Sequence, residues 1–134
     1  MTTYVDSSAL MKRYVSEPDS ATAIALLATD QVLVTSWLTM VEVRRNLARL
    51  LRGSALTTAR RQLVADLDAM ALVDIDESTC SSAAQIAENL GVRSIDSIHL
   101  ATAQRLLIPA LPFITFDHRQ AQAARSLGFG VLGA

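Results

Sequence analysis

The segment TTYVDSSALMKRYV, residues 2–15, decides the fold of this chain. Residues 2–5 are a short run of β-favouring side chains that ends at Asp6, and from Ser8 to Val15 the apolar residues recur at helical spacing. The same order returns in PFITFDHRQAQAARSLGF, residues 112–129, where a strand at 112–116 meets Asp117 and a helix that Gly128 ends. Both segments therefore predict a strand, an aspartate and a helix in direct succession.

Between these two segments the pattern continues to alternate. We expect helices at 19–28, 36–53, 54–71, 76–91 and 94–106, and strands at 31–35, 72–75 and 129–132. Parallel neighbouring strands need crossover connections, which the intervening helices supply. The sequence therefore predicts an α/β fold with a mainly parallel central sheet of about five strands covered on both faces, and a protruding helical hairpin at 36–71.

Composition limits the class of protein. A chain of 134 residues suits one domain spanning 1–134, and a single cysteine, Cys80, excludes an internal disulfide and a thiolate metal site. The start, MTTYVDSS, lacks the basic flank of a signal peptide. The longest apolar stretch, 106–116, contains two prolines and is shorter than the roughly 20 residues that cross a bilayer. We therefore expect a cytoplasmic protein that does not enter a membrane.

Four acidic residues are the candidate catalytic residues and metal ligands: Asp6, Glu42, Asp96 and Asp117. Each also has an ordinary structural explanation. Asp6 and Asp117 can cap helices, Asp96 suits the first turn of a helix, and Glu42 can pair with Arg45. As a set they favour a site, because the strands at 2–5 and 112–116 can be central neighbours with both aspartates at their carboxyl ends.

Carboxylates gathered in this way repel one another unless a cation neutralises them. Ligands that are all oxygen atoms favour Mg²⁺ or Mn²⁺ over zinc. Water bound to such an ion is a better nucleophile, and the ion stabilises charge that develops on a phosphoryl oxygen. The acids therefore predict metal-dependent hydrolysis of a phosphodiester.

Four stretches carry a family resemblance, in order and spacing along the whole chain: YVDSSALMKRY from Tyr4, TMVEVRR from Thr39, RSIDSIHLATA from Arg93 and FITFDHRQAQAARSLGF from Phe113. They resemble the signature blocks of PIN-domain ribonucleases, and the short chain with a helical hairpin is similar to the VapC-like toxins of bacterial type II toxin–antitoxin pairs. The resemblance implies a three-layer α/β/α sandwich. It further implies that the four acids hold Mg²⁺ or Mn²⁺ and that RNA is cut to leave a 5′-phosphate and a 3′-hydroxyl. A cognate antitoxin and a homodimer are the implied protein partners.

Other polar residues near the acids are candidates for supporting roles. Ser8 and Thr115 match hydroxyls of the family blocks and can hydrogen-bond a ligand carboxylate, or can equally be a helix cap and a strand residue. Arg93 can reach a phosphate or a site carboxylate. For His99, packing or hydrogen bonding is favoured over proton transfer, and His118 is a weaker candidate. Asp76 is excluded from the site, because its place before Glu77 predicts a helix cap.

The hairpin contains a basic arm of six arginines without an acidic residue between Val43 and Ala65: Arg44, Arg45, Arg49, Arg52, Arg60 and Arg61. These side chains can bind RNA phosphates, lie in solvent or dock a partner. The hairpin also has more apolar residues than it needs to pack against itself: Trp37, Met40, Val41, Leu47, Leu50, Leu51, Leu56 and Leu63. The resemblance places an antitoxin segment and a second subunit there.

Rival functions remain open from the sequence. A phosphoacceptor signalling domain also gathers acids around Mg²⁺ at strand ends, but it needs a late lysine, and the only lysine here is Lys12. A PIN-like binding protein that no longer cuts would keep the acids, and enzymes that cut DNA or process ribosomal RNA would share them.

Overall fold

The computed structural model describes residues 1–29 and 32–134, and its centre is an all-parallel sheet of five strands. The strands are β1 (Thr2–Val5), β2 (Val32–Ser36), β3 (Ala71–Val73), β4 (Pro112–Thr115) and β5 (Gly130–Gly133), in the spatial order β3-β2-β1-β4-β5. The predicted parallel sheet is confirmed, with β1 and β4 as central neighbours. Gln31, predicted to begin the second strand, lies outside the described residues.

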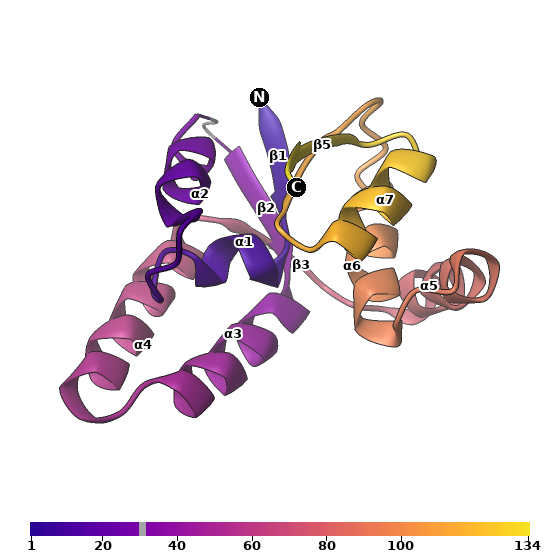
Figure 1. Ribbon diagram of the computed structural model, residues 1–134. Helices are drawn as coiled ribbons and strands as arrows, with labels where there is room; N and C mark the ends of the chain where they lie inside the picture. Colours follow the sequence, from indigo (N-terminus) through magenta and orange to yellow (C-terminus); the bar gives the residue numbers. More distant parts are fainter. Residues whose placement is uncertain (30–31) are drawn as a thin grey trace.

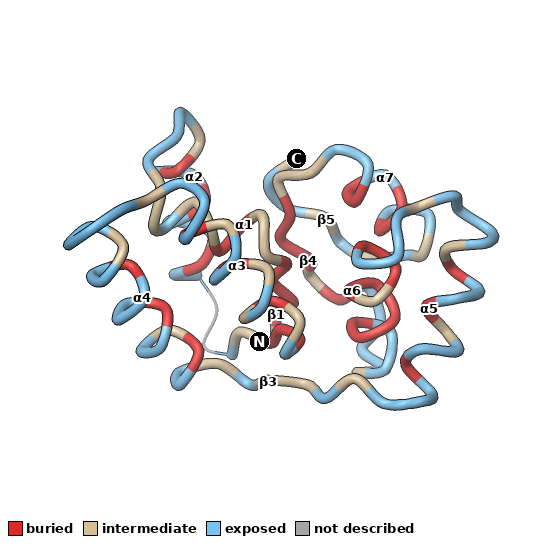
Figure 2. Tube along the Cα trace, turned by 90° about the horizontal axis from the view of Figure 1, so that it is seen from below, coloured by how far each residue is buried: buried red, intermediate tan, exposed pale blue. Residues whose placement is uncertain are grey.

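Helices cover both faces of the sheet (Figures 1 and 2). One side carries α1 (Ser7–Met11), α2 (Ser20–Leu27), α3 (Trp37–Leu50) and α4 (Gly53–Asp68), and the other carries α5 (Glu77–Leu90), α6 (Ser94–Gln104) and α7 (His118–Ser126). The alternation of side chains along the strands produces these layers, since neighbouring residues point to opposite faces. Tyr4 and Phe113 pack with α5–α7, whereas Val5 and Ile114 pack with α1–α4. The predicted three-layer sandwich is therefore confirmed.

The helix boundaries follow the capping residues. The side chain of Ser36 caps α3, that of Asp76 caps α5, and Gly91 ends α5 in the left-handed conformation with φ of 66°. Several predicted boundaries were wrong in detail. The first helix ends at Met11 and not at Val15, α3 ends at Leu50 and not at Gly53, and α4 ends at Asp68 and not at Ala71.

The helices α3 and α4 form the predicted hairpin, which extends from the sheet in Figure 1. Leu47 and Leu63 are buried in the core, so the expectation that they belong to an unpartnered apolar surface was wrong. Met40, Leu51 and Leu56 are partly buried against that core, and Trp37, Val41 and Leu50 are exposed. The arginines of the basic arm are all exposed. Among the described residues, no helix combines the length and apolar character needed to cross a membrane.

Candidate functional site

Asp6 and Asp117 lie at the carboxyl ends of the two central strands. Val5 of β1 is in register with Ile114 of β4, and the Asp6 amide donates a hydrogen bond to the Ile114 carbonyl at 3.2 Å. Each aspartate also caps the helix that follows. Asp6 Oδ1 accepts from the Ala9 amide, and Asp117 Oδ1 accepts from the Gln120 amide. Capping and the gathering of acids therefore occur together, because both follow from a strand that passes directly into a helix.

Two hydroxyl groups connect these aspartates. Ser8 Oγ donates to Asp6 Oδ1 at 2.6 Å, accepts from the Phe116 amide at 2.9 Å and lies 3.3 Å from Thr115 Oγ1. Thr115 Oγ1 in turn accepts from the Asp117 amide at 3.1 Å. The structure thus places Ser8 and Thr115 between the two acids, where they orient the strand ends and one carboxylate oxygen of Asp6.

Asp96 joins the site from the other layer. It lies in the first turn of α6, is nearly buried, and accepts a hydrogen bond from Arg93 Nε at 2.9 Å through Oδ2. The same guanidinium approaches Asp117, with Arg93 Nη2 at 3.5 Å from Oδ2. Gln120 Nε2 donates to the Asp96 carbonyl, which connects the start of α7 to α6. Arg93 therefore joins two of the four acids.

Glu42 completes the set from α3, and its hydrogen-bond partner is not Arg45, the residue with which its helical spacing would allow a pair. Glu42 Oε1 lies 2.6 Å from His99 Nε2, and His99 Nδ1 lies 2.8 Å from the Tyr4 hydroxyl. These contacts connect α3 to α6 and β1 across the edge of the sheet. The prediction that His99 serves in packing and hydrogen bonding agrees with this geometry. Its link to Glu42 was missed, although the three-residue spacing from Asp96 already indicated a shared helical face.

The electrostatics of the site centre on Asp6, which is 4% exposed. Burial raises the pKa of its carboxyl, while nearby His99 and the hydrogen bonds from Ser8, Thr115 and the Ala9 amide partly offset that rise. No lysine or arginine bonds to Asp6 among the residues the structure describes. A buried carboxylate without a cation beside it is the arrangement that a bound cation would stabilise.

The donor atoms suit a hard divalent cation in type. Glu42 and Asp96 each commit one carboxylate oxygen to a protein partner, and their second oxygens have no hydrogen bond within the described part of the chain. The side chains as positioned do not form a closed set, since no three His, Cys, Asp or Glu residues among 1–29 and 32–134 are arranged to hold an ion. Arg93 supplies positive charge to two of the acids instead.

Two hollows open at this edge of the sheet. One, of about 260 Å³, is lined by Glu42, Arg93, Ser94 and Ile95. The other, of about 460 Å³, begins beside Asp96 and Arg93 and extends along α7, where Arg119, Gln122 and Ser126 line it. Glu42 and Asp96 are therefore reached from solvent through surfaces that carry Arg93 and Arg119.

The sequence shows, over most of its length, the family to which the chain belongs. The PIN domain model matches residues 3–126, and the chain belongs to the PIN-domain family. It is 37% identical over 129 residues to ribonuclease VapC46 of Mycobacterium tuberculosis, covering 96% of this chain and 95% of that protein. It is 32% identical over 133 residues to ribonuclease VapC47 of the same species, covering 94% and 92%.

Solved structures share the fold at low sequence identity. The crystal structure of FitAcB from Neisseria gonorrhoeae superposes with a TM-score of 0.77 at 22% identity, covering 98% of this chain and 96% of that one. VapC20 of M. tuberculosis, described as a sarcin-ricin loop cleaving toxin, gives a TM-score of 0.72 at 18% identity over 100% and 98% of the two chains. These likenesses show that the chain shares its fold with these two structures.

Proposed function

We propose that this protein is a metal-dependent endoribonuclease and acts as the toxin of a type II toxin–antitoxin pair. The observation that carries the proposal is the gathering of Asp6, Asp96 and Asp117 at one edge of the sheet, with Glu42 facing it from α3. Family membership and curated relatives named as VapC ribonucleases support RNA as the substrate.

In this proposal the four acids hold Mg²⁺ or Mn²⁺, which when bound would activate water and stabilise charge on the phosphoryl oxygen. The protein residues prepare that arrangement. The Ala9 and Gln120 amides and the Ser8 hydroxyl fix the aspartates at the strand ends, so their orientation does not depend on flexible side chains. Arg93 neutralises two acids before the cation enters, and it is then free to contact an RNA phosphate.

RNA reaches the acids along the hollow beside α7. Its lining combines the guanidinium groups of Arg93 and Arg119 with the side chains of Gln122 and Ser126, and Val92 and Ala123 provide apolar surface. Arginine binds phosphate through paired N–H groups, and apolar surface accepts a base. The hollow therefore suits a nucleotide next to the cleaved bond.

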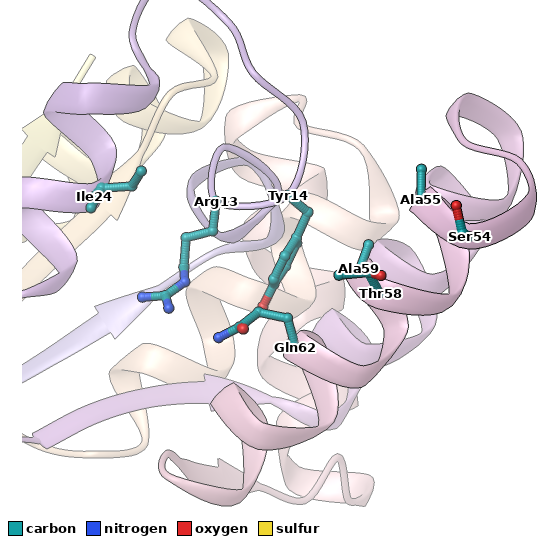
Figure 3. A pocket seen from close by; sticks show the side chains of 8 residues that line it. All are labelled: Arg13, Tyr14, Ile24, Ser54, Ala55, Thr58, Ala59 and Gln62. Carbon is teal, nitrogen blue, oxygen red and sulfur yellow. The ribbon is translucent and has the colours of Figure 1, made fainter.

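Two surfaces on the hairpin suit protein partners. A hollow of about 560 Å³ lies between α4 and the segment from α1 to α2. Figure 3 shows Arg13, Tyr14 and Ile24 facing the α4 side chains across it. We assign this hollow to the antitoxin segment. The exposed Trp37, Val41 and Leu50 on α3 suit a second copy of the chain.

A phosphoacceptor role is disfavoured by Lys12. Its ammonium group pairs with Glu17 and with Asp19, the latter at 2.8 Å, and so it is committed away from the acidic edge. Incubation with a small phosphodonor such as acetyl phosphate would reveal a phosphorylated aspartate if that rival were correct.

The decisive experiment incubates the purified protein with total bacterial RNA in Mg²⁺ or Mn²⁺, with and without EDTA, and maps new 5′ ends. We expect cleavage that EDTA abolishes and that Asp117→Asn lowers by at least about 100-fold, since the substitution preserves shape and removes a ligand charge. Asp76→Asn, at a helix cap outside the site, is the matched control. Cleavage that persists in EDTA or in Asp117→Asn would contradict the proposal.

A further inference from the structure

We propose that His99 is a positioning residue that holds Glu42 in place for the metal site, and that Tyr4 in turn holds His99. The inference rests on the proposed function and adds two residues to it. It is drawn from two consecutive hydrogen bonds, Tyr4 Oη to His99 Nδ1 at 2.8 Å and His99 Nε2 to Glu42 Oε1 at 2.6 Å.

The three residues belong to three separate elements. Tyr4 is in the central strand β1, His99 is in α6 on one side of the sheet, and Glu42 is in α3 on the other side. Tyr4 is fully buried, the His99 side chain is 2% exposed, and the Glu42 carboxylate reaches the accessible edge. These two hydrogen bonds form a Tyr4–His99–Glu42 relay that extends from the core to the site and fixes α3 relative to α6.

The direction of the hydrogen bonds follows from Tyr4. A tyrosine hydroxyl carries its proton at neutral pH, and the Tyr4 hydroxyl lies 2.8 Å from His99 Nδ1, so it can donate to that ring nitrogen. An imidazole that accepts at Nδ1 carries its proton on Nε2 in the neutral form. That N–H points at Glu42, and both ring nitrogens are satisfied by the same arrangement.

Glu42 needs this support more than the other acids do. Asp6 and Asp117 are fixed by backbone amides at helix caps, and Asp96 lies in the first turn of its helix. Glu42 sits in the middle of α3 on a longer side chain, and His99 is its only hydrogen-bond partner among the described residues. Without the imidazole, its carboxylate would sample several rotamers and pay the entropy of ordering whenever a cation binds.

Two matched substitutions separate the two hydrogen bonds. In His99→Gln the amide nitrogen lies about as far along the side chain as Nε2, and so it still reaches Glu42. In His99→Asn the amide lies where Nδ1 was, and so it reaches Tyr4 only. Mn²⁺ binding is measured directly by electron paramagnetic resonance, and thermal unfolding in EDTA reports how far each variant is destabilised.

We expect His99→Asn to weaken Mn²⁺ binding by about 10- to 100-fold, the usual effect of losing the hydrogen-bond partner of a ligand. His99→Gln should stay within about 3-fold of the original protein, although both variants lose similar packing. Tyr4→Phe keeps the stacking on Phe113, at 5.0 Å between ring centroids, and should give an intermediate loss.

Equal losses in the Gln and Asn variants, or undiminished Mn²⁺ binding in His99→Asn, would overturn the positioning role while RNA cleavage by the original protein stands. Failure of the original protein to bind Mn²⁺ would instead overturn the proposed function together with this inference. If His99→Gln and His99→Asn both lost Mn²⁺ binding in proportion to their loss of thermal stability, His99 would be a packing residue and not a positioning residue.

Discussion

At the scale of single residues, the acidic edge is governed by how each carboxylate is compensated. Asp6 is buried and bonded only to uncharged donors, whereas Asp96 shares the Arg93 guanidinium with Asp117. The difference separates two effects that a cation would have. It would relieve the desolvation of Asp6, and it would compete with Arg93 for the other two aspartates.

The first consequence concerns the pH dependence of stability without metal. Because burial raises the pKa of Asp6, the folded state favours the neutral carboxyl. Protonation of Asp6 therefore stabilises the folded state. This contribution is fully present below the ordinary aspartate pKa and is lost as pH rises through the raised pKa of Asp6 in the folded state. We expect Asp6→Asn, which keeps the contacts with Ser8 and Ala9, to have the higher melting temperature at neutral pH in EDTA.

The difference in melting temperature between Asp6→Asn and the original protein should shrink as pH falls through the raised pKa of Asp6. Thermal unfolding from pH 7.5 to pH 4 measures it as the difference between the two proteins, and Asp68→Asn, an exposed substitution near the end of α4, controls for general charge effects. A constant difference at all pH values would show that Asp6 is not the group responsible.

Arg93 yields the second prediction. Its side chain is 71% exposed, so its pairs with Asp96 and Asp117 are partly screened by solvent. We expect Arg93→Ala to tighten Mn²⁺ binding without RNA by about 2- to 30-fold, since each of the two partly exposed pairs contributes roughly 0.2 to 1 kcal/mol. The same change should weaken binding of a non-cleavable RNA.

The matched control is Arg119→Ala. Arg119 lines the same hollow but forms no ion pair with the acids within the described residues, so its loss should weaken RNA binding and leave Mn²⁺ affinity unchanged. If Arg93→Ala bound Mn²⁺ less tightly than the original protein, Arg93 would be supporting the metal site and not competing with it.

At the scale of elements, the strand and helix pattern could be predicted because short β-favouring runs, capping residues and Gly91 act locally. The pairing of β1 with β4 followed from general rules for parallel sheets. The Tyr4–His99–Glu42 relay could not be predicted, because it depends on the distance between two helices on opposite sides of the sheet. Side-chain reach across layers has no local signal in the sequence.

The hairpin shows the same limit. Its apolar residues were recognised as a group, but only the packing against α1 and the sheet separates buried Leu47 and Leu63 from exposed Trp37 and Val41. Periodicity tells which residues share a face of a helix and not how deeply a neighbouring element covers that face.

The third prediction tests the hollow beside α4. Thr58 lines this hollow and is exposed, so Thr58→Arg places a long charged side chain where we expect the antitoxin segment. Binding of the antitoxin, measured by calorimetry, should weaken by at least about 10-fold, or 1.4 kcal/mol, while RNA cleavage by the free protein is unchanged.

The neighbouring residue provides the control, because Thr57 is also exposed on α4 but does not line the hollow. Thr57→Arg should bind the antitoxin as the original protein does. Equal affinities for the two variants would place the antitoxin on another surface, such as the exposed α3 residues.

At the scale of the whole molecule, the acids tie the three layers together. Asp6 and Asp117 follow strands of the sheet, Glu42 comes from the layer of α1–α4, and Asp96 comes from the layer of α5–α7 (Figure 2). A cation held by all four would therefore bridge layers whose cores are otherwise separated by the sheet. Binding to the folded state alone raises the free energy of unfolding by mass action.

The fourth prediction follows from that linkage. Mn²⁺ at 100 times its dissociation constant should stabilise the original protein by about 2.7 kcal/mol, seen as a rise of several degrees in melting temperature. Asp117→Asn should lose most of this response, and Asp76→Asn should keep it, because Asp76 caps α5 away from the acidic edge. A response that survives in Asp117→Asn and is abolished in Asp76→Asn would move the cation to the start of α5, where Asp76 already pairs with Arg105 at 3.1 Å. Loss in Asp117→Asn alone would mean that the cation that stabilises the fold binds at the acidic edge, between the layers.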